Sequence, residues 1–394
     1  MPSAEPTRAS DGAQRVLVID GGPLDGSASA GERASLDLLD GLVALGAEVS
    51  FLPMGSRGER DADLLAALAA RGVARVHPMP TASQGLANLL STQPVDVVIA
   101  NRPGPAAMAT LALQQHPEVA RIYWGHDIHG RRLAAQQAAR GDVEGHRARA
   151  TVLAEQRCWD FYDLTAYPTE REAAAVAASV GPGRSLACPY FLLSGADLPP
   201  STTPRADRAG LLMVGGAAHA PNLDAVEWAV SEILPLVQVS HPGLRLTIVG
   251  DWPTPLVGRF AGNGVHFAGR VSDDELRRLH DEALCLFAPL RFGSGSRRKI
   301  VAAMGLGLPV VTTMEGQEGL LVRDGRGLAD GLLIAETASE LAGAVATLND
   351  DPSLWHLCVD ISRQAVSTVY DQLHYTAAVA SALQQAVDNR DSRL

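Results

Sequence analysis

The chain has 394 residues, of which 46% are hydrophobic and 20% are charged, and its formal net charge is −11. This length predicts two or three domains with enough apolar material for a core in each. Acidic and basic residues are spread evenly, so neither half forms the basic surface that binds nucleic acid or anionic lipid.

The cysteines and the apolar segments place limits on the compartment. Four cysteines lie far apart without metal-ligand spacing, which fits reduced cytoplasmic thiols: Cys158, Cys188, Cys285 and Cys358. Residues 1–14 are polar and lack the apolar region of a signal peptide, and we expect them to be disordered. No apolar run approaches the roughly 20 residues of a membrane span. We therefore expect a cytoplasmic monomer or homodimer with no transmembrane segment and no metal.

The first half alternates short apolar runs with amphipathic stretches. The apolar runs predict strands at 15–20, 48–53, 95–100, 121–124, 164–167 and 185–188. The amphipathic stretches predict helices at 32–45, 62–70 and 105–115, and one long polar helix at 131–159. Strands separated by helices predict a parallel α/β sheet.

Residues 198–209 interrupt this alternation. They are rich in proline, threonine and small residues without periodicity, which predicts an interdomain linker. The pattern then restarts, with strands expected at 211–215, 244–250, 265–268, 283–289, 308–313 and 332–334. Helices are expected at 223–239, with Asn222 as N-cap, and at 273–282, 297–305, 339–348, 352–369 and 375–387. The sequence thus predicts a first domain at 15–197 and a second at 210–369.

The only lysine in the chain, Lys299, is accompanied by thirty-two arginines and belongs to the run Gly293-Ser-Gly-Ser-Arg-Arg-Lys299. The arginine bias is typical of a GC-rich genome. Cations in the first turn of a helix oppose its dipole by about 0.3–1 kcal/mol each. A glycine-rich loop that leads into such a helix becomes favourable once an anion binds, which predicts a phosphate or diphosphate site. The alternative is a solvated basic turn.

A series of motifs in the second half occurs in one order. The motifs are Gly215-Gly-Ala-Ala-His-Ala-Pro-Asn222, Asp224-Ala-Val226, Ile233-Leu-Pro235, Leu246-Thr-Ile-Val-Gly250, Ala288-Pro-Leu-Arg291, Gly293-Ser-Gly-Ser-Arg-Arg-Lys-Ile300, Ala303-Met304, Gly307-Leu-Pro-Val-Val-Thr312 and Gly316-Gln-Glu-Gly-Leu320. This series resembles the nucleotide-sugar-binding domain of retaining GT-B glycosyltransferases of the family 4 type (glycosyl transferases group 1). Asp127-Ile-His129 and Arg132 resemble a segment at the same place in the first domain of that family.

The resemblance implies an α/β fold of two Rossmann-like domains facing a cleft, with the C-terminal helix crossing back so that residues 370–394 complete the first domain. It also implies that a nucleoside diphosphate sugar is the co-substrate and that no cofactor or metal is needed. The residues implied to bind the diphosphate are Gly215, Gly216, His219, Arg291, Gly293, Ser294, Gly295, Ser296, Arg297 and Lys299. Arg297 and Lys299 would stabilise the charge of the leaving group, because arginine grips a phosphate bidentately and lysine acts as a point charge. His219 is equally well interpreted as a residue that packs the loop.

Catalytic candidates in the first domain are His129 and Asp127. His129 follows a predicted strand, where it would contact the transferred sugar or the incoming nucleophile; the alternative is a structural histidine held by Asp127. Arg132 would contact the donor or pair with a carboxylate. Gly22, Ala30 and Gly31 belong to a loop expected on the acceptor side.

The sequence departs from the family at two carboxylates eight positions apart. Ser294 and Ala302 stand at those positions, and the second carboxylate normally holds the nucleotide ribose. Such a contact is worth about 1.5–3 kcal/mol. We expect Glu318 or Glu315 to bind the ribose or sugar instead, Glu318 being favoured by its motif. The alternatives are an unusual mode of donor binding and a catalytically weakened relative.

These observations predict a retaining, metal-independent glycosyltransferase that uses a nucleotide sugar and a soluble small-molecule acceptor. The acidic first domain argues against a lipid acceptor, and the GC-rich bias favours secondary-metabolite biosynthesis. The alternatives are a nucleotide-binding pseudoenzyme that serves as partner subunit of a transferase, indicated by Ala302, and a sugar-nucleotide epimerase of the same fold.

Overall fold

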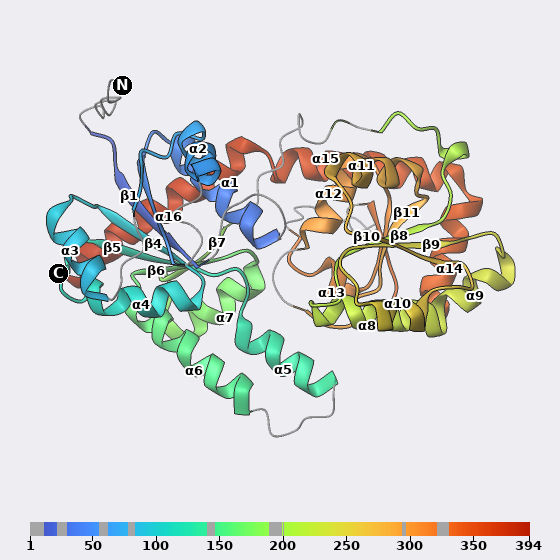
Figure 1. The fold of residues 1–394 in the computed structure, drawn as a ribbon, viewed down its shortest axis with the longest axis horizontal. Helices are drawn as coiled ribbons and strands as arrows, with labels where there is room; N and C mark the ends of the chain where they lie inside the picture. The colour runs from blue at the N-terminus through green and yellow to red at the C-terminus, as the bar shows by residue number, and fades with distance from the viewer. Residues whose placement is uncertain are drawn as a thin grey trace. The chain divides into compact units, whose positions relative to one another are not determined.

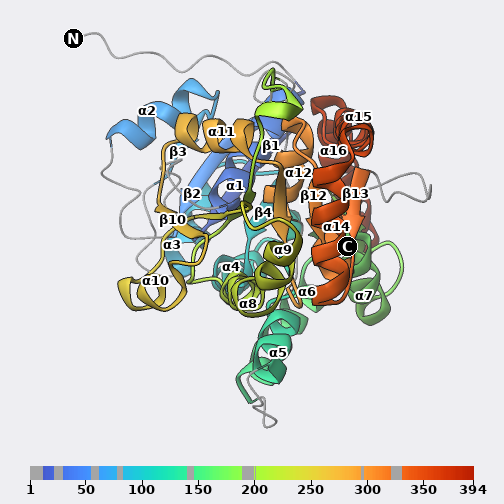
Figure 2. The same cartoon turned by 90° about the vertical axis from the view of Figure 1, so that its right-hand side faces the viewer.

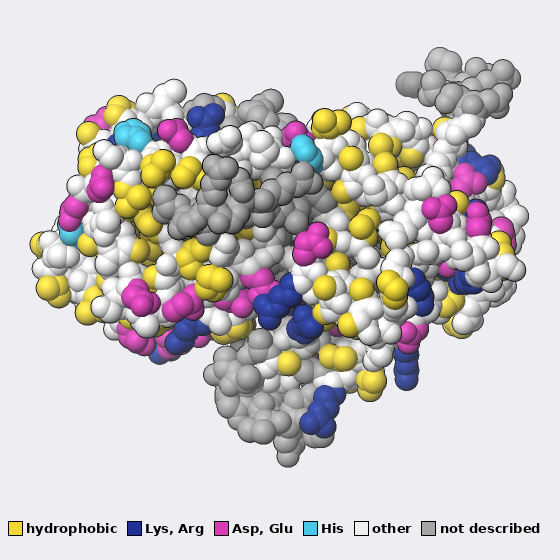
Figure 3. Space-filling view, turned by 180° about the vertical axis from the view of Figure 1, so that it is seen from behind, with side chains coloured by type: hydrophobic (Ala, Val, Ile, Leu, Met, Phe, Trp, Pro, Cys, Tyr) yellow, Lys and Arg dark blue, Asp and Glu magenta, His cyan; other side chains and the backbone are white. Residues whose placement is uncertain are grey.

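The computed structural model describes residues 12–21, 30–54, 62–77, 83–139, 146–188, 199, 201–293, 297–320 and 331–394. The predicted disordered N-terminus lies largely outside these residues. No helix within the described ranges is long and apolar enough to cross a membrane. Acidic and basic side chains are interspersed on the face shown in Figure 3, as the even spread of charge in the sequence predicts.

The chain divides into two compact units. The first comprises residues 1–131, 145–192 and 372–394, and the second comprises 132–144 and 193–371. We call them the first and second domains. The division assigns 132–144 to the second domain, whereas the sequence pattern places these residues in the first.

The first domain contains a parallel seven-stranded sheet of order β3-β2-β1-β4-β5-β6-β7 (Figure 1). Its strands are β1 (Arg15–Asp20), β2 (Glu48–Pro53), β3 (Arg75–Val76), β4 (Val97–Asn101), β5 (Ala120–Trp124), β6 (Leu164–Tyr167) and β7 (Ser185–Ala187). The order reverses between β1 and β4, which are paired with Val16 beside Val97. Ligands of open parallel sheets bind beyond the carboxyl ends of strands at such a reversal.

Helices cover both faces of this sheet (Figure 1). They are α1 (Ala30–Ala44), α2 (Ala62–Ala70), α3 (Ser83–Thr92), α4 (Pro103–Leu113), α6 (His146–Phe161), α7 (Glu170–Val180) and α16 (Gln372–Arg393). One core joins α1, α2 and α16 to the sheet, and another joins α3, α4, α6 and α7 to its opposite face. The return of the C-terminal helix to the first domain is thereby confirmed.

The predicted long helix at 131–159 corresponds to two helices in the described residues. The structure has α5 (His129–Ala139) and α6 as separate helices. Gly141 and Gly145 lie in the sequence between them. Residues 140–145 lie outside the described residues.

The second domain contains a parallel six-stranded sheet of order β10-β9-β8-β11-β12-β13. Its strands are β8 (Leu211–Val214), β9 (Leu246–Val249), β10 (Val265–Gly269), β11 (Cys285–Ala288), β12 (Val310–Thr312) and β13 (Leu332–Ile334). The helices are α8 (Ala220–Trp228), α9 (Leu234–Ser240), α10 (Thr254–Phe260), α11 (Asp273–Glu282), α12 (Arg298–Leu306), α13 (Met314–Gln317), α14 (Ala338–Asp350) and α15 (Pro352–Val369). Figures 1 and 2 show α9 beside α14, and α12 packs on α15. The predicted pair of Rossmann-like domains is confirmed.

The helix expected at 223–239 begins earlier and is not uniform. α8 starts at Ala220 with His219 at its N-cap, so the expectation that Asn222 caps it is wrong. Pro221 can occupy the first turn because a proline there loses no intrahelical hydrogen bond. A π-helical turn (Ala229–Ile233) separates α8 from α9, whose second residue is Pro235. Pro235 has no N–H group to donate to the preceding turn. This missing donor explains why regular α-helical hydrogen bonding gives way to a π-helical turn before α9.

The segment 201–208 differs from a plain linker. It forms a short 3₁₀ turn (Arg205–Asp207) followed by Arg208, whose side chain is buried. Arg208 donates to the carbonyls of Thr203 at 3.1 Å and His280 at 2.9 Å. Arg208 therefore fixes segment 201–208 to the second domain, although the composition of this segment alone indicates flexibility.

Candidate functional site

Three loops of the second domain leave the carboxyl ends of adjacent strands. They follow β8, β11 and β12, and the strand order reverses between β8 and β11. The loop after β8 begins at Gly215, and the loop after β11 leads through Arg291 and Gly293 towards α12. This edge is where the topology of an open parallel sheet places a ligand.

The loop after β8 depends on glycine for its conformation. Gly215 has φ +143°, and a Cβ atom there would lie 2.3 Å from Nδ2 of Asn222. Asn222 uses Nδ2 to donate to the Gly216 carbonyl at 3.1 Å, and Trp252 donates to the Gly215 carbonyl at 3.0 Å. His219, at the N-cap of α8, donates its backbone N–H to the Gly216 carbonyl at 3.3 Å. Asn222 thus braces the loop from within the helix.

Lys299 lies in the first turn of α12 and donates from Nζ to Oδ1 of Asn222 at 2.8 Å. Burial, together with the nearby positive charge of Arg297, lowers the pKa of the Lys299 ammonium to about 7. A cation held in this way gains most from an anion, because charge interactions strengthen as water is excluded. The single lysine and the loop after β8 therefore form one unit through Asn222.

Arg297 is the N-cap residue of α12 and is only 7% exposed. Its Nη2 donates to Oε1 of Glu315 at 2.9 Å and to the Glu315 carbonyl at 3.2 Å. Glu315 lies in α13, where Thr313 caps the helix by accepting from the Gly316 N–H at 3.1 Å. The structure thus brings Arg297, Lys299 and Glu315 to one edge of the sheet.

Gly293 also belongs to this edge. A Cβ atom on Gly293 would lie 2.5 Å from Nη2 of Arg297, so a side chain there would displace the guanidinium. Glu318 is half-buried at the end of α13. Ser294, Gly295 and Ser296, which the family resemblance places at the diphosphate, lie outside the described residues.

Arg291 is engaged elsewhere. Its guanidinium makes two hydrogen bonds to Asp224 of α8, at 2.9 and 2.6 Å, and lies 5.1 Å over the ring of Trp228. The Asp224 carboxylate raises the pKa of Arg291. Arg291 therefore links its loop to α8, and its predicted diphosphate contact would require it to leave or share Asp224.

In the first domain, His129 begins α5 between two carboxylates. Its Nε2 lies 3.3 Å from Oδ1 of Asp127, and its Nδ1 lies 3.3 Å from Oε1 of Glu155. Fully buried Glu155 also accepts the backbone N–H groups of His129 and Gly130, each at 2.8 Å. Two carboxylates thus fix the imidazole ring. The structure brings Asp127 and His129 together as predicted and adds Glu155.

Glu155 was not predicted. It lies on α6 in line with Cys158, Trp159 and Tyr162, all of which are buried. A glutamate on the apolar face of a helix requires a buried partner, so this periodicity is a signal that could have identified it.

A second unpredicted cluster lies where β1 and β4 end. Fully buried Asp20 accepts from Ser35 at 2.5 Å, Asn101 at 2.8 Å and the Gly21 N–H at 2.6 Å. Arg102 lies 3.6 Å from the same carboxylate and has φ 73°, which is rare outside glycine. Burial raises the pKa of Asp20, and the Arg102 charge opposes this. Backbone strain and a buried carboxylate at the reversal of strand order make this edge a candidate for ligand binding.

The remaining acceptor-side residues lie near this cluster or outside the described residues. A Cβ atom on Gly31 would lie 3.1 Å from Nη2 of Arg102 and 3.3 Å from Nδ1 of His126, so glycine permits a close approach there. Ala30 begins α1. Arg132 lies half-buried in α5, in the part assigned to the second domain. Gly22 lies outside the described residues.

Within the described residues, no group of three or more histidine, cysteine, aspartate or glutamate side chains could hold a metal ion. All four cysteines are free and buried.

Comparison with known proteins gives matches at two levels. Residues 208–351 match the family described as glycosyl transferases group 1. An uncharacterized 44.6 kDa protein in the cps region of Klebsiella pneumoniae is 28% identical over 116 residues. That match covers 28% of this chain and spans only 30% of the relative's length.

Solved structures match over almost the whole chain. Sucrose-phosphate synthase from Thermosynechococcus elongatus has a TM-score of 0.71 at 15% identity, covering 94% of this chain and 98% of that one. Anabaena Alr3699/HepE in complex with UDP-glucose has a TM-score of 0.68 at 15% identity, covering 94% and 99%. At these identities the likeness shows the fold, which is GT-B. Residues 208–351 thus match the model of the group 1 glycosyl transferase family, and the chain has the GT-B fold.

Proposed function

We propose that the protein is a retaining, metal-independent glycosyltransferase that moves a sugar from a nucleoside diphosphate sugar to a soluble small-molecule acceptor. One observation carries the proposal: Arg297 and the chain's only lysine begin α12 at the ligand-binding edge of the sheet in the family-matched domain. Cations at that place would otherwise oppose the helix dipole.

The donor diphosphate would bind at the N-terminus of α12. Negative charge grows on the diphosphate as the glycosidic bond breaks. Lys299, already oriented by Asn222, and the N–H groups of the first turn would stabilise that charge. Groups fixed before the reaction need no reorganisation in the transition state, which makes this the largest catalytic contribution.

The nucleotide ribose is assigned to Glu318. The motif Gly316-Gln-Glu-Gly-Leu320 favours Glu318, whereas the Glu315 carboxylate holds Arg297. Ala302, which replaces the family's ribose carboxylate, lies four residues after Arg298 in the same helix and offers no hydrogen-bonding group.

On the acceptor side, His129 would contact the transferred sugar or the attacking group. Its ring is held by Asp127 and Glu155, so its orientation is set before any substrate binds. The edge that contains Asp20 and Arg102 is the corresponding place for the acceptor, because it lies at the strand reversal of the first sheet.

The proposal is tested by incubating the purified protein with a panel of nucleotide sugars and candidate small-molecule acceptors. UDP-glucose is the first donor, since the Anabaena relative was crystallised with it. Release of nucleoside diphosphate and NMR of the product's anomeric proton report transfer and stereochemistry. Lys299→Ala should reduce kcat/KM by about a hundredfold or more, on the scale of lost electrostatic donors. Arg270→Gln, a change of an exposed arginine in the same domain, is the matched control and should retain turnover.

A second candidate is a nucleotide-binding protein without transferase activity, and Ala302 is the observation that favours it. Tight binding of a nucleoside diphosphate with neither hydrolysis nor transfer across the panel would support that candidate. Inversion of the anomeric centre would contradict the retaining mechanism, and an absence of nucleotide binding would contradict both candidates.

A further inference from the structure

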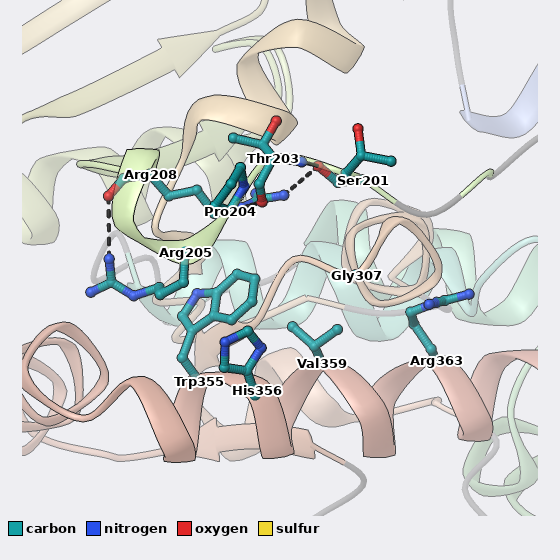
Figure 4. A pocket seen from close by; sticks show the side chains of 11 residues that line it. Ser201, Thr203, Pro204, Arg205, Arg208, Gly307, Trp355, His356, Val359 and Arg363 are labelled. Atoms are coloured by element: carbon teal, nitrogen blue, oxygen red, sulfur yellow. Dashed lines mark hydrogen bonds between the residues drawn. The ribbon is translucent and has the colours of Figure 1, made fainter.

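A cavity of about 250 Å³ lies in the second domain, away from the loops that follow β8, β11 and β12. Its walls come from the segment 201–208, from Gly307 after α12, and from α15 (Figure 4). The segment is joined to α12 by a hydrogen bond from the Ser201 N–H to the Leu306 carbonyl at 3.2 Å. The cavity is therefore bounded by three parts of the chain that hold one another in place.

The charge of this cavity opposes that of the whole protein. Arg205, Arg208 and Arg363 line it together with His356, and no carboxylate is among its described lining residues. The chain as a whole carries a formal charge of −11. Three guanidinium groups around one small cavity repel one another unless an anion is present.

The three arginines differ in what they have to offer a ligand. Arg208 is buried over the Trp355 ring at 5.2 Å, and its donors are used by backbone carbonyls and by the Ser201 hydroxyl. It contributes charge and holds Ser201. Arg205 is fixed by the Asn349 carbonyl at 2.7 Å, while its Nε is buried without a hydrogen-bond acceptor among the described residues. Buried donors are normally paired, and an oxyanion bound beside Arg205 is one acceptor that would fit this guanidinium.

Arg363 extends from α15 along the opposite wall. Its aliphatic stem passes close to Gly307, where a Cβ atom would lie 3.3 Å from the arginine Cδ. Its guanidinium is exposed, and it forms no hydrogen bond or ion pair with the described residues. Figure 4 shows Arg205 and Arg363 at opposite ends of the cavity, with His356 and Val359 between them on α15. Arg205 and Arg363 could thus contact one anion from opposite sides.

We propose that this cavity binds a phosphate monoester or free phosphate, with Arg205 and Arg363 as donors and the Ser201 and Thr203 side chains beside them. Guanidinium groups match phosphate oxygens with paired donors. A volume of about 250 Å³ is below the usual range for drug-sized ligands, about 300–1,000 Å³, and suits a phosphate with a small attached group.

The site lies within the second domain and is distinct from the proposed donor site, and its two walls are close in sequence to two of the four points at which the chain passes from one domain to the other. Segment 201–208 follows the crossing after Leu192, and α15 ends two residues before the crossing after Asp371. A phosphate held by Arg205 and Arg363 would tie these two segments together.

The test uses the full chain and calorimetric titration with inorganic phosphate, glucose 6-phosphate and glucose at constant ionic strength. Four proteins are compared: wild type, Arg363→Gln, Lys299→Ala and Arg270→Gln. Wild type, Lys299→Ala and Arg270→Gln should bind a phosphate-containing probe alike, and Arg363→Gln should weaken its binding about tenfold or more, the loss expected for one charged hydrogen bond. Tighter binding of glucose 6-phosphate than of phosphate identifies an ester as the ligand class, and the reverse identifies free phosphate.

Three outcomes would overturn the proposal: no binding of either phosphate probe to wild type, unchanged affinity in Arg363→Gln, or loss of binding in Lys299→Ala alone, which assigns the phosphate to the donor site. Arg363 is exposed, so its substitution should leave the unliganded melting temperature unchanged. Arg363→Lys should restore part of the affinity, since it returns the charge without the paired donors.

Discussion

Lys299 combines three properties at the residue scale: it is the only lysine, its Nζ contacts Asn222, and burial lowers its pKa to about 7. The sequence identified the residue and its place at a helix start. It could not identify the Asn222 contact, because residues 222 and 299 meet only through the packing of α8 and α12 against one sheet.

The lowered pKa predicts that diphosphate binding is coupled to proton uptake. An anion favours the charged ammonium and so raises its pKa in the complex. Affinity should therefore be highest below about pH 7, where Lys299 is already protonated, and should fall by up to tenfold per unit as the pH rises above 7. Titration calorimetry with UDP between about pH 7.5 and 9, in buffers of different ionisation enthalpy, measures the uptake.

Lys299→Arg is the matched control for this coupling. Arginine stays protonated throughout this range, so the variant should bind UDP without taking up a proton. Equal proton uptake in wild type and Lys299→Arg would show that another group titrates.

Glu155 predicts an effect on stability in the first domain. Glu155→Ala leaves the backbone N–H groups of His129 and Gly130 without their acceptor inside the molecule. Each lost acceptor costs about 1–3 kcal/mol, so urea unfolding should show a loss of roughly 2–6 kcal/mol in the first domain. Glu155→Gln keeps one acceptor oxygen and should lose less. If both variants unfold like wild type, Glu155 does not hold the start of α5.

At the element scale, the periodicity of the sequence predicts most strands and the longer helices of both domains. Strand β2 and helices α2 and α15 have the predicted bounds. Strand β3 has two residues, α13 has four, and α10 has seven, and none was predicted. Elements this short show too few repeats for a period to be read, and their positions depend on neighbouring strands and caps.

α3 and α7 were missed for a different reason. Each is long enough to show a period, yet α7 reads Glu-Arg-Glu-Ala-Ala-Ala-Val-Ala-Ala-Ser-Val, in which alanine blurs the contrast between faces. Its start is marked by Thr169, whose hydroxyl accepts from the Glu172 N–H at 3.0 Å. The Thr-x-x-Glu spacing is a capping signal that the sequence did contain.

The loop after β8 gives a prediction at the same scale. Gly215→Ala introduces a Cβ atom 2.3 Å from Asn222 Nδ2 and a strained φ of +143°. The substitution should destabilise the second domain by about 1–3 kcal/mol and weaken UDP binding, because Asn222 also orients Lys299.

Gly258→Ala is the control for this substitution. Gly258 lies in α10, and a Cβ atom there meets nothing within 4 Å. Alanine should leave UDP affinity unchanged and stabilise the helix by up to about 1 kcal/mol. The melting temperature and the UDP affinity are measured for both variants. Normal UDP binding by Gly215→Ala would show that the loop after β8 does not contribute to the donor site.

At the scale of the whole molecule, the sequence predicts two α/β domains and the return of the last helix, and both are present. The sequence predicts the boundary between the two domains less accurately. Segment 201–208 lacks periodicity, but Arg208 anchors it to the second domain through contacts with residues 72–75 positions later. Such long-range contacts leave no local signal in composition.

The return of α16 predicts that its core residues stabilise the first domain selectively. Tyr375 is fully buried there, and its ring packs against Gly41. A Cβ atom added to Gly41 would lie only 2.6 Å from that ring. Tyr375→Ala should destabilise the first domain by about 3–5 kcal/mol, the range for large aromatic truncations. Calorimetry should show an earlier first transition, while UDP binding at low temperature persists in the second domain. Leu373→Ala, 74% exposed on the same helix, is the control and should unfold like wild type.

The central claim is that the start of α12 binds the diphosphate of a nucleotide sugar. It is tested most directly by comparing the affinities of UDP and uridine for wild type and Lys299→Ala by calorimetry near neutral pH. The account predicts that wild type binds UDP more tightly than uridine and that Lys299→Ala weakens UDP binding about tenfold or more, the scale of one charged hydrogen bond, while leaving uridine binding unchanged. Equal affinity of the two proteins for UDP would contradict it.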